Sequence, residues 1–292
     1  MRYFRPLMAC LTGLTLLSNG LATAQAPAPV AVDVGGRKIV FPAPEGFAQS
    51  NGIDLNWDKT FLTLLPQTNH LLVTMNTTEE VAGLKAGKIP GSARTYNAQI
   101  VRQVEKTEIG DQTFSKVRGE IKSGIMETRA KMDAEIKKAL SSGKAKLGIV
   151  DQALEISDSA ILAFFEDTPT GLGFTMVAKL QTNKGTPEEK SEKMVVAALM
   201  IPVNGRLINL YANATYRNDD DLTWVQNAVK SWRDSVVAAN PRVQGPDYQP
   251  GGQGFMGFDL GRITSGMLIG AAVGLAIAIF KWITTRKNPP AL

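Results

Sequence analysis

The sequence predicts an α+β domain followed by one C-terminal transmembrane helix. We expect an antiparallel or mixed sheet of five to seven strands, with two main helices on one face. Three observations lead to this prediction. Several segments alternate apolar and polar residues, as strands do. Two segments repeat apolar residues every three or four positions, as amphipathic helices do. Residues 263–283 form one long apolar run.

The first 24 residues have the pattern of a secretory signal peptide. Arg2 and Arg5 precede a mostly apolar stretch at 7–17, and Ala22-Thr23-Ala24 provides small residues for cleavage before Gln25. An uncleaved N-terminal anchor is the alternative. Residues 25–36 are small and proline-containing, and we expect them to be disordered after cleavage. The folded domain is therefore expected to span residues 37–240.

Alternating segments locate the strands. In Leu172–Leu180 every second residue is apolar, which predicts one buried and one mostly wet face. The apolar segment Lys193–Val203 meets Arg206–Tyr216 across Asn204-Gly205, a dipeptide suited to a tight type I′ hairpin. Ala160–Phe165 and Leu172–Leu180 are expected to form a second hairpin. Weaker strand candidates are Lys38–Phe41, Phe61–Leu65 and His70–Asn76.

Two segments have helical periodicity. Asp219–Asn240 carries one apolar stripe, begins after Asn218 with three aspartates, and is followed by Pro241. We interpret the aspartates as helix N-terminal residues rather than as a cation site, because carboxylates there accept bonds from unpaired N–H groups. The second helix runs from about Asp111 to Ser142. Its first third also fits a strand.

The C-terminal region predicts a membrane anchor. Residues 241–262 contain three prolines and six glycines and are expected to be a flexible linker. The 21 residues 263–283 contain Lys281 as their only charge, and as a helix they would span about 31 Å, the thickness of a bilayer core. A buried helix of a soluble domain is the alternative. Arg286 and Lys287 place the tail, 284–292, in the cytoplasm by the positive-inside rule.

Together these signals predict a single-pass protein of a bacterial inner membrane, with its domain in the periplasm. The net charge of +5 comes from the ends of the chain, because residues 25–258 hold 26 basic and 26 acidic residues. A neutral domain lacks the basic surface that nucleic-acid binding requires, so we expect no nucleic-acid partner. The only cysteine, Cys10, leaves with the signal peptide, which excludes a disulfide or thiolate site in the mature chain.

One face of the predicted transmembrane helix consists of small residues. Gly266, Gly270, Gly274 and Ala278 recur every fourth position, so that another helix backbone could approach closely. This spacing predicts association in the membrane, with a second copy or with another membrane protein. Glycine and alanine are also common in membrane helices without such a role.

The residues outside this helix indicate no catalytic, metal or cofactor site. His70 is the only histidine, so the sequence indicates neither a Ser/His/Asp arrangement nor a histidine metal site. Carboxylates such as Glu155, Asp158 and Glu166 could pair in space as those of a glycosidase do. That possibility keeps a membrane-tethered hydrolase of an envelope polymer as an alternative.

Three stretches resemble a family. Gly205–Tyr211, Asp221–Trp224 and Trp232–Asn240 resemble the closing strand and helix of uncharacterised, membrane-anchored exported proteins of Gram-negative bacteria. The resemblance implies a fold and a location but no catalytic residue or cofactor. We therefore expect a non-enzymatic binding or assembly module at the lipid bilayer. An accessory or sensor subunit of a membrane complex is a further alternative.

Overall fold

The computed structural model describes residues 27–88, 94–128, 134, 155–182, 187, 189–241, 261 and 263–271. A two-stranded sheet joins β1 (Val30–Val34) and β2 (Arg37–Phe41). The main sheet contains β3 (Phe47–Gln49), β4 (Asn69–Thr77), β5 (Arg94–Val101), β6 (Glu155–Thr168), β7 (Gly171–Thr182), β8 (Lys190–Val203) and β9 (Arg206–Thr215). The helices are α1 (Leu55–Leu64), α2 (Thr78–Lys85), a 3-10 turn at Arg102–Val104, α3 (Asp111–Thr128), α5 (Asp219–Ala239) and the helical residues 263–271.

The described chain is an α+β domain around one seven-stranded sheet. The strand order is β3-β4-β5-β9-β8-β7-β6, and every pair is antiparallel. Both predicted hairpins are confirmed, β6 with β7 and β8 with β9. At the second turn Asn204 and Gly205 have φ of 47° and 76°, the left-handed region that a type I′ turn requires and that these two residues tolerate.

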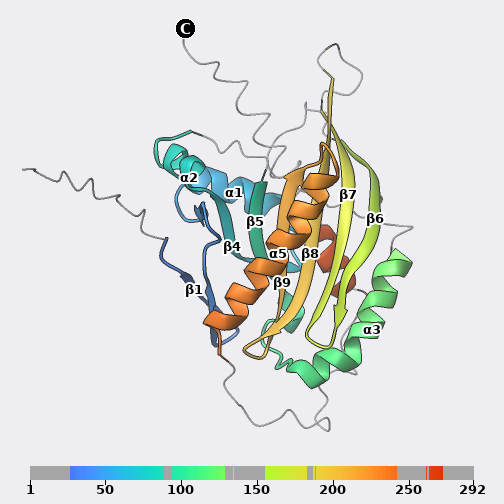
Figure 1. Ribbon diagram of the computed structural model, residues 1–292. Helices are drawn as coiled ribbons and strands as arrows, with labels where there is room; N and C mark the ends of the chain where they lie inside the picture. The colour runs from blue at the N-terminus through green and yellow to red at the C-terminus, as the bar shows by residue number, and fades with distance from the viewer. Residues whose placement is uncertain are drawn as a thin grey trace, which may run out of the picture.

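Helices cover both faces of the sheet, so the prediction that both main helices share one face is wrong. On one face α5 packs with Val225, Val229, Trp232 and Val236, next to β1 and β2. On the other face lie α1, α3 and residues 263–271. Figure 1 shows α5 crossing in front of the sheet and the red 263–271 helix behind it. The physical reason is β8, whose residues 194–201 are buried on both sides, so that each face needs a cover.

Two other predictions also need correction. Val30–Val34 is paired with β2, so residues 25–36 are not all disordered and the domain begins before residue 37. Phe61–Leu65 is part of α1 and its end, not a strand. The helix begins at Asp54, whose side chain accepts from the Trp57 N–H, and Trp57, Phe61 and Leu65 are buried at a spacing of four. The five residues Phe61–Leu65 are too few to show a helical period.

Two predicted helices are described only in part. The helix predicted from about Asp111 is helical over Asp111–Thr128, so its first third is not a strand. Its predicted continuation to Ser142 lies largely outside the described residues. Of the predicted span 263–283, only residues 263–271 are described, and they are helical. Within the described ranges no helix combines the length and the apolar character needed to cross a membrane. The transmembrane helix stays a prediction.

Candidate functional site

A row of buried polar side chains crosses the centre of the sheet. It lies on the same face of the sheet as α3, which covers a different part of that face. Alternate residues of a strand share a face, and the register sets Gln99 beside Asn209, Asn97 beside Tyr211, and Thr95 beside Asn213. On the next strand Thr74 lies beside Asn97, and all these residues are less than 10% exposed. We call the following side chains the polar row: Asn69, Thr74, Thr95, Asn97, Gln99, Asn209, Tyr211 and Asn213.

Hydrogen bonds connect part of the polar row. The Asn69 amide donates to Gln99 Oε1 at 2.8 Å, and the Gln99 amide donates to Asn97 Oδ1 at 2.7 Å. The Asn213 amide donates to Thr95 Oγ1 at 3.2 Å. Such bonds offset the free energy of burying polar groups, which is unfavourable when they have no partner.

Residues 263–271, which we call the docked segment, lie directly on the polar row. Its backbone carbonyls accept hydrogen bonds from three row side chains: Asn69 to Gly266 O at 2.8 Å, Gln99 to Gly270 O at 3.4 Å, and Tyr211 to Met267 O at 3.2 Å. Burial raises the pKa of the Tyr211 phenol above its usual range, so the hydroxyl remains protonated and can donate. The sheet thus contacts the backbone of the docked segment.

Glycine at two positions permits this close backbone contact. A Cβ atom on Gly266 would lie 2.8 Å from Asn69 Oδ1, and one on Gly270 would lie 2.7 Å from both Gln99 Oε1 and Tyr211 Oη. Real Cβ atoms essentially never approach that closely. Gly266 and Gly270, predicted to face another membrane helix, therefore face the chain's own sheet. Gly274 and Ala278 lie outside the described residues, and the association in the membrane stays a prediction.

Most of the docked segment is buried, and only Ser265 and Ile269 of its residues are partly exposed. Ile263, Thr264, Met267 and Ala271 are fully buried, and Leu268 is 1% exposed. A Cβ on Gly124 of α3 would lie 2.9 Å from Thr264 Cγ2, so the helix backbone of α3 passes close to the segment. The docked segment therefore lies between the polar row and α3.

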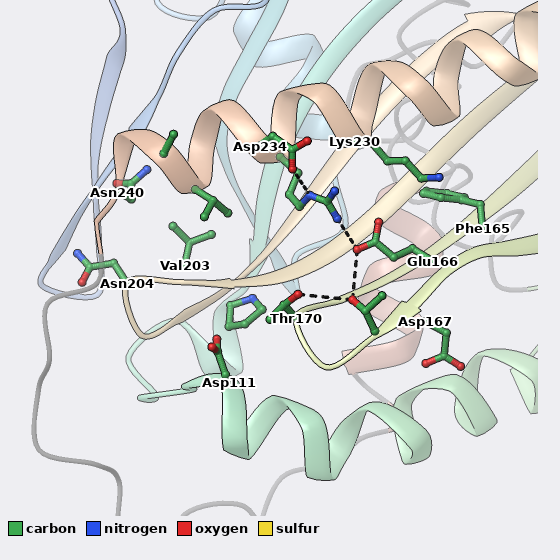
Figure 2. A pocket seen from close by; sticks show the side chains of 15 residues that line it. Asp111, Phe165, Glu166, Asp167, Thr170, Val203, Asn204, Lys230, Asp234 and Asn240 are labelled. Atoms are coloured by element: carbon green, nitrogen blue, oxygen red, sulfur yellow. Dashed lines mark hydrogen bonds and ion pairs between the residues drawn. The ribbon is translucent and has the colours of Figure 1, made fainter.

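A separate cavity of about 880 Å³ lies at the other face, between the end of α5 and the tips of the two hairpins. Glu166 of β6, labelled in Figure 2, lies in this cavity and pairs with Arg233 of α5. The Glu166 side chain is 7% exposed and forms an ion pair with Arg233. Lys230 lies over the ring of Phe165, 5.2 Å from its centroid.

Glu166 and Asp167 do not form a general acid and base pair. Glu166 is bound to Arg233, while Asp167, the next residue, points to the opposite face and binds Arg118 at 3.0 Å and Lys122 at 2.7 Å. The hydrogen bond from Lys122 lowers the pKa of Asp167, whereas a general acid needs a raised one. Asp158 lies further along β6, and the Glu155 side chain is outside the described part.

Other sequence candidates have structural roles. The three aspartates lie in the first turn of α5, as predicted, but the side chain that caps the helix is that of Asn218, which accepts from the Asp220 N–H, while Asp221 accepts from the Arg217 N–H at 3.0 Å. His70 Nδ1 lies 2.9 Å from Glu105 Oε1. Among the described residues no group of three His, Cys, Asp or Glu side chains could hold a metal ion.

Sequence reasoning missed the polar row because it missed β5. Its residues Thr95, Asn97 and Gln99 alternate with Tyr96, Ala98 and Ile100, and this period of two could have predicted the strand. The same alternation, however, would have predicted that the polar side of the strand faces solvent. Only the structure shows that this side is buried under the docked segment.

Comparison with known proteins identifies no family. No family model and no curated protein match this chain. Among solved structures, a mutant of the protein Mog1 is 12% identical, with a TM-score of 0.25 over 72% of this chain and 89% of that one. The Saccharomyces cerevisiae Ran-binding protein Mog1p is 11% identical, with a TM-score of 0.24 over 72% of this chain and 91% of its own. Similarities at this level carry no argument about function.

Proposed function

We propose that this protein is a single-pass, membrane-anchored extracytoplasmic binding or assembly module without catalytic activity. Its small-residue helix face, which includes Gly266 and Gly270, serves for association. The observation that carries the proposal is the apolar run 263–283 with glycine at every fourth position, and the contact of Gly266 and Gly270 with the sheet shows that this face allows close approach. The signal-peptide pattern and the apolar run 263–283 support the location.

Membrane anchoring and docking exclude each other for residues 263–271. If these residues form the first turns of a transmembrane helix, they cannot also lie between the sheet and α3. The apolar side chains Ile263, Met267 and Leu268 lose little by the exchange, because lipid tails are as apolar as a protein core. The remaining apolar residues, 272–283, favour the membrane. Anchoring therefore leaves the polar row without its docked segment.

Alkaline carbonate extraction of bacterial membranes tests the proposal. We expect the protein to stay in the pellet, and a reporter fused after Leu292 to be active in the cytoplasm. The variant Val273→Arg/Leu275→Arg changes residues at the centre of the predicted span and outside the docked segment. Because each arginine at a helix centre opposes insertion by about 3 kcal/mol, this variant should move to the supernatant.

A matched control separates insertion from general damage. Leu55 is 85% exposed on α1, so Leu55→Arg should leave the protein in the pellet. Release of the unmodified protein by carbonate, or a reporter that is active only on the outer side, would overturn the proposal.

A further inference from the structure

A groove of about 500 Å³ runs along the first half of α5, separate from the cavity beside Glu166. Thr223, Asn227 and Ser231 line this groove, and because they recur every fourth position they share one flank of the helix. The connection between β2 and β3, residues 44–45, lines it as well. The groove therefore lies between α5 and a loop of the small sheet.

Tyr96 of β5 also lines the groove. The alternation of side chains along β5 directs Tyr96 to the face that α5 covers, opposite to the polar row. The residue is 5% exposed, and no hydrogen bond joins its hydroxyl to another described residue. Burial raises the pKa of the phenol to about 12, so the hydroxyl stays protonated and both donates and accepts. A buried polar group without a partner is unfavourable, and a ligand in the groove would supply the missing partner.

Trp224 of α5 adds a partly exposed aromatic ring to the same groove. The guanidinium carbon of Arg94 lies 4.4 Å from the centroid of this ring, and Arg94 Nη2 lies 3.7 Å from Asp221 Oδ1. Tyr96 packs edge-on against the ring, with the centroids 5.8 Å apart. These contacts fix the orientation of the indole, so a ligand that packs on it needs to order little of the protein.

The polar groups of the groove distinguish between classes of ligand. The hydroxyl and amide groups of the three α5 side chains and of Tyr96 donate as well as accept hydrogen bonds. Within the described part of the chain, the charged side chains that line the groove are two carboxylates, Glu45 and Asp220. An anion would be repelled by these carboxylates, and a cation would need acceptors alone. A sugar needs both donors and acceptors for its hydroxyls, and an apolar surface for the C–H face of its ring.

We propose that this groove binds a neutral carbohydrate. One sugar ring packs its C–H face on Trp224, and its hydroxyls bond to Tyr96 and to the polar flank of α5. The volume of about 500 Å³ is typical of a ligand pocket. The groove is separate from the glycines of the docked segment, so the inference does not depend on the proposed function.

A glycan array tests the class of ligand. The full-length protein is applied in a polyoxyethylene detergent, which carries no sugar, to immobilised neutral and charged oligosaccharides. We expect the protein to be retained on neutral oligosaccharides. The retained oligosaccharide is then titrated in free form by isothermal titration calorimetry, so that the affinities of variants can be compared.

Tyr96→Phe removes only the hydroxyl and should weaken binding by about 3- to 10-fold. The urea midpoint of this variant should stay unchanged or rise, because no hydrogen bond within the chain is lost. Tyr216→Phe is the matched control. The Tyr216 hydroxyl donates to Asp219 at 2.9 Å, and since Tyr216 does not line the groove, the affinity should stay unchanged.

Two further variants test the ring and the polar flank of α5. Trp224→Ala should weaken binding at least about 10-fold. Asn227→Ala/Ser231→Ala, at two exposed positions, should weaken it at least about 5-fold. Because exposed positions tolerate alanine, this second variant keeps the test decisive if Trp224→Ala fails to fold.

Three outcomes would overturn the inference: retention of the protein on no neutral oligosaccharide, equal affinities of Tyr96→Phe and Tyr216→Phe, or calorimetric binding of choline in place of a sugar. The last outcome would assign the groove to a cation, held by Trp224 and the carboxylates. Failure of the proposed function is separate, because it would appear as carbonate release, which the sugar titration in detergent does not measure.

Discussion

Substitution of Gly270 by alanine is the most direct perturbation of the docked segment. The new Cβ would lie 2.7 Å from Gln99 Oε1 and from Tyr211 Oη, so both side chains must move. Their two hydrogen bonds to the segment contribute about 0.5–1.5 kcal/mol each, and forcing a methyl group into a packed site costs about 1–3 kcal/mol. The combined loss is about 2–6 kcal/mol.

Helix propensity acts in the opposite direction. Alanine favours a helix by about 1 kcal/mol over glycine, which leaves a net loss of about 1–5 kcal/mol for docking. Since about 1.4 kcal/mol corresponds to a tenfold change, we expect the docked state to become about 5-fold to 5,000-fold less favourable. Propensity alone predicts the other sign, so the experiment distinguishes the two effects.

The assay starts from the Cys10→Ser protein that also carries Gly124→Cys/Thr264→Cys. A Cβ on Gly124 would lie 3.6 Å from Thr264 Cβ, within the range that a disulfide spans. The equilibrium between the disulfide of this introduced pair and glutathione reports the effective concentration of one thiol at the other. Gly270→Ala should lower this concentration by the factor given above. Gly119→Ala is the control, because a Cβ at Gly119 on α3 meets no atom within 4 Å. If Gly270→Ala leaves the effective concentration as high as Gly119→Ala does, the steric reasoning is refuted.

Two further predictions concern the stability of the domain. Asp167 has a lowered pKa in the folded state, so its ion pairs contribute stability above its ordinary value of 3.8, and this contribution disappears as the pH falls through the folded pKa. Urea titrations should show Asp167→Asn less stable than wild type at pH 7, and this difference should shrink as the pH falls below 3.8; a difference that stays constant would contradict this. Trp232 is 1% exposed and donates to Pro42 O at 2.9 Å, so Trp232→Phe should lower the free energy of unfolding by about 2–3 kcal/mol. Trp224→Phe, at a partly exposed ring beside Arg94, should cost less than about 1 kcal/mol, and equal losses would contradict this assignment.

Local signals in the sequence were sufficient for much of the fold. The period of two in Leu172–Leu180 and the turn at Asn204-Gly205 predicted the central hairpins, and the apolar stripe of Asp219–Asn240 predicted α5. These elements depend on interactions within about 30 residues. The side of the sheet on which each helix packs depends on long-range packing, so the sequence did not indicate it.

The candidate site was only half predictable. The small residues Gly266 and Gly270 stand out by their spacing, which predicted the close approach of another membrane helix, whereas the structure places both against the chain's own sheet. Their partners, Asn69, Gln99 and Tyr211, come from three strands that are far apart in the chain. Polar residues of this kind are usually solvent-exposed on a strand, and no local pattern distinguishes those that a distant segment covers.

The tip of the β6–β7 hairpin links the two helical layers mechanically. Asp167 is tied to α3 through Arg118 and Lys122, and the adjacent Glu166 is tied to α5 through Arg233. α3 also touches the docked segment at Gly124. If α3 shifts when the docked segment leaves, Asp167 would move with α3. Because Glu166 is the adjacent residue, the movement would reach the wall of the cavity on the far side of the sheet. A signal could thus cross the sheet without any change in its strands.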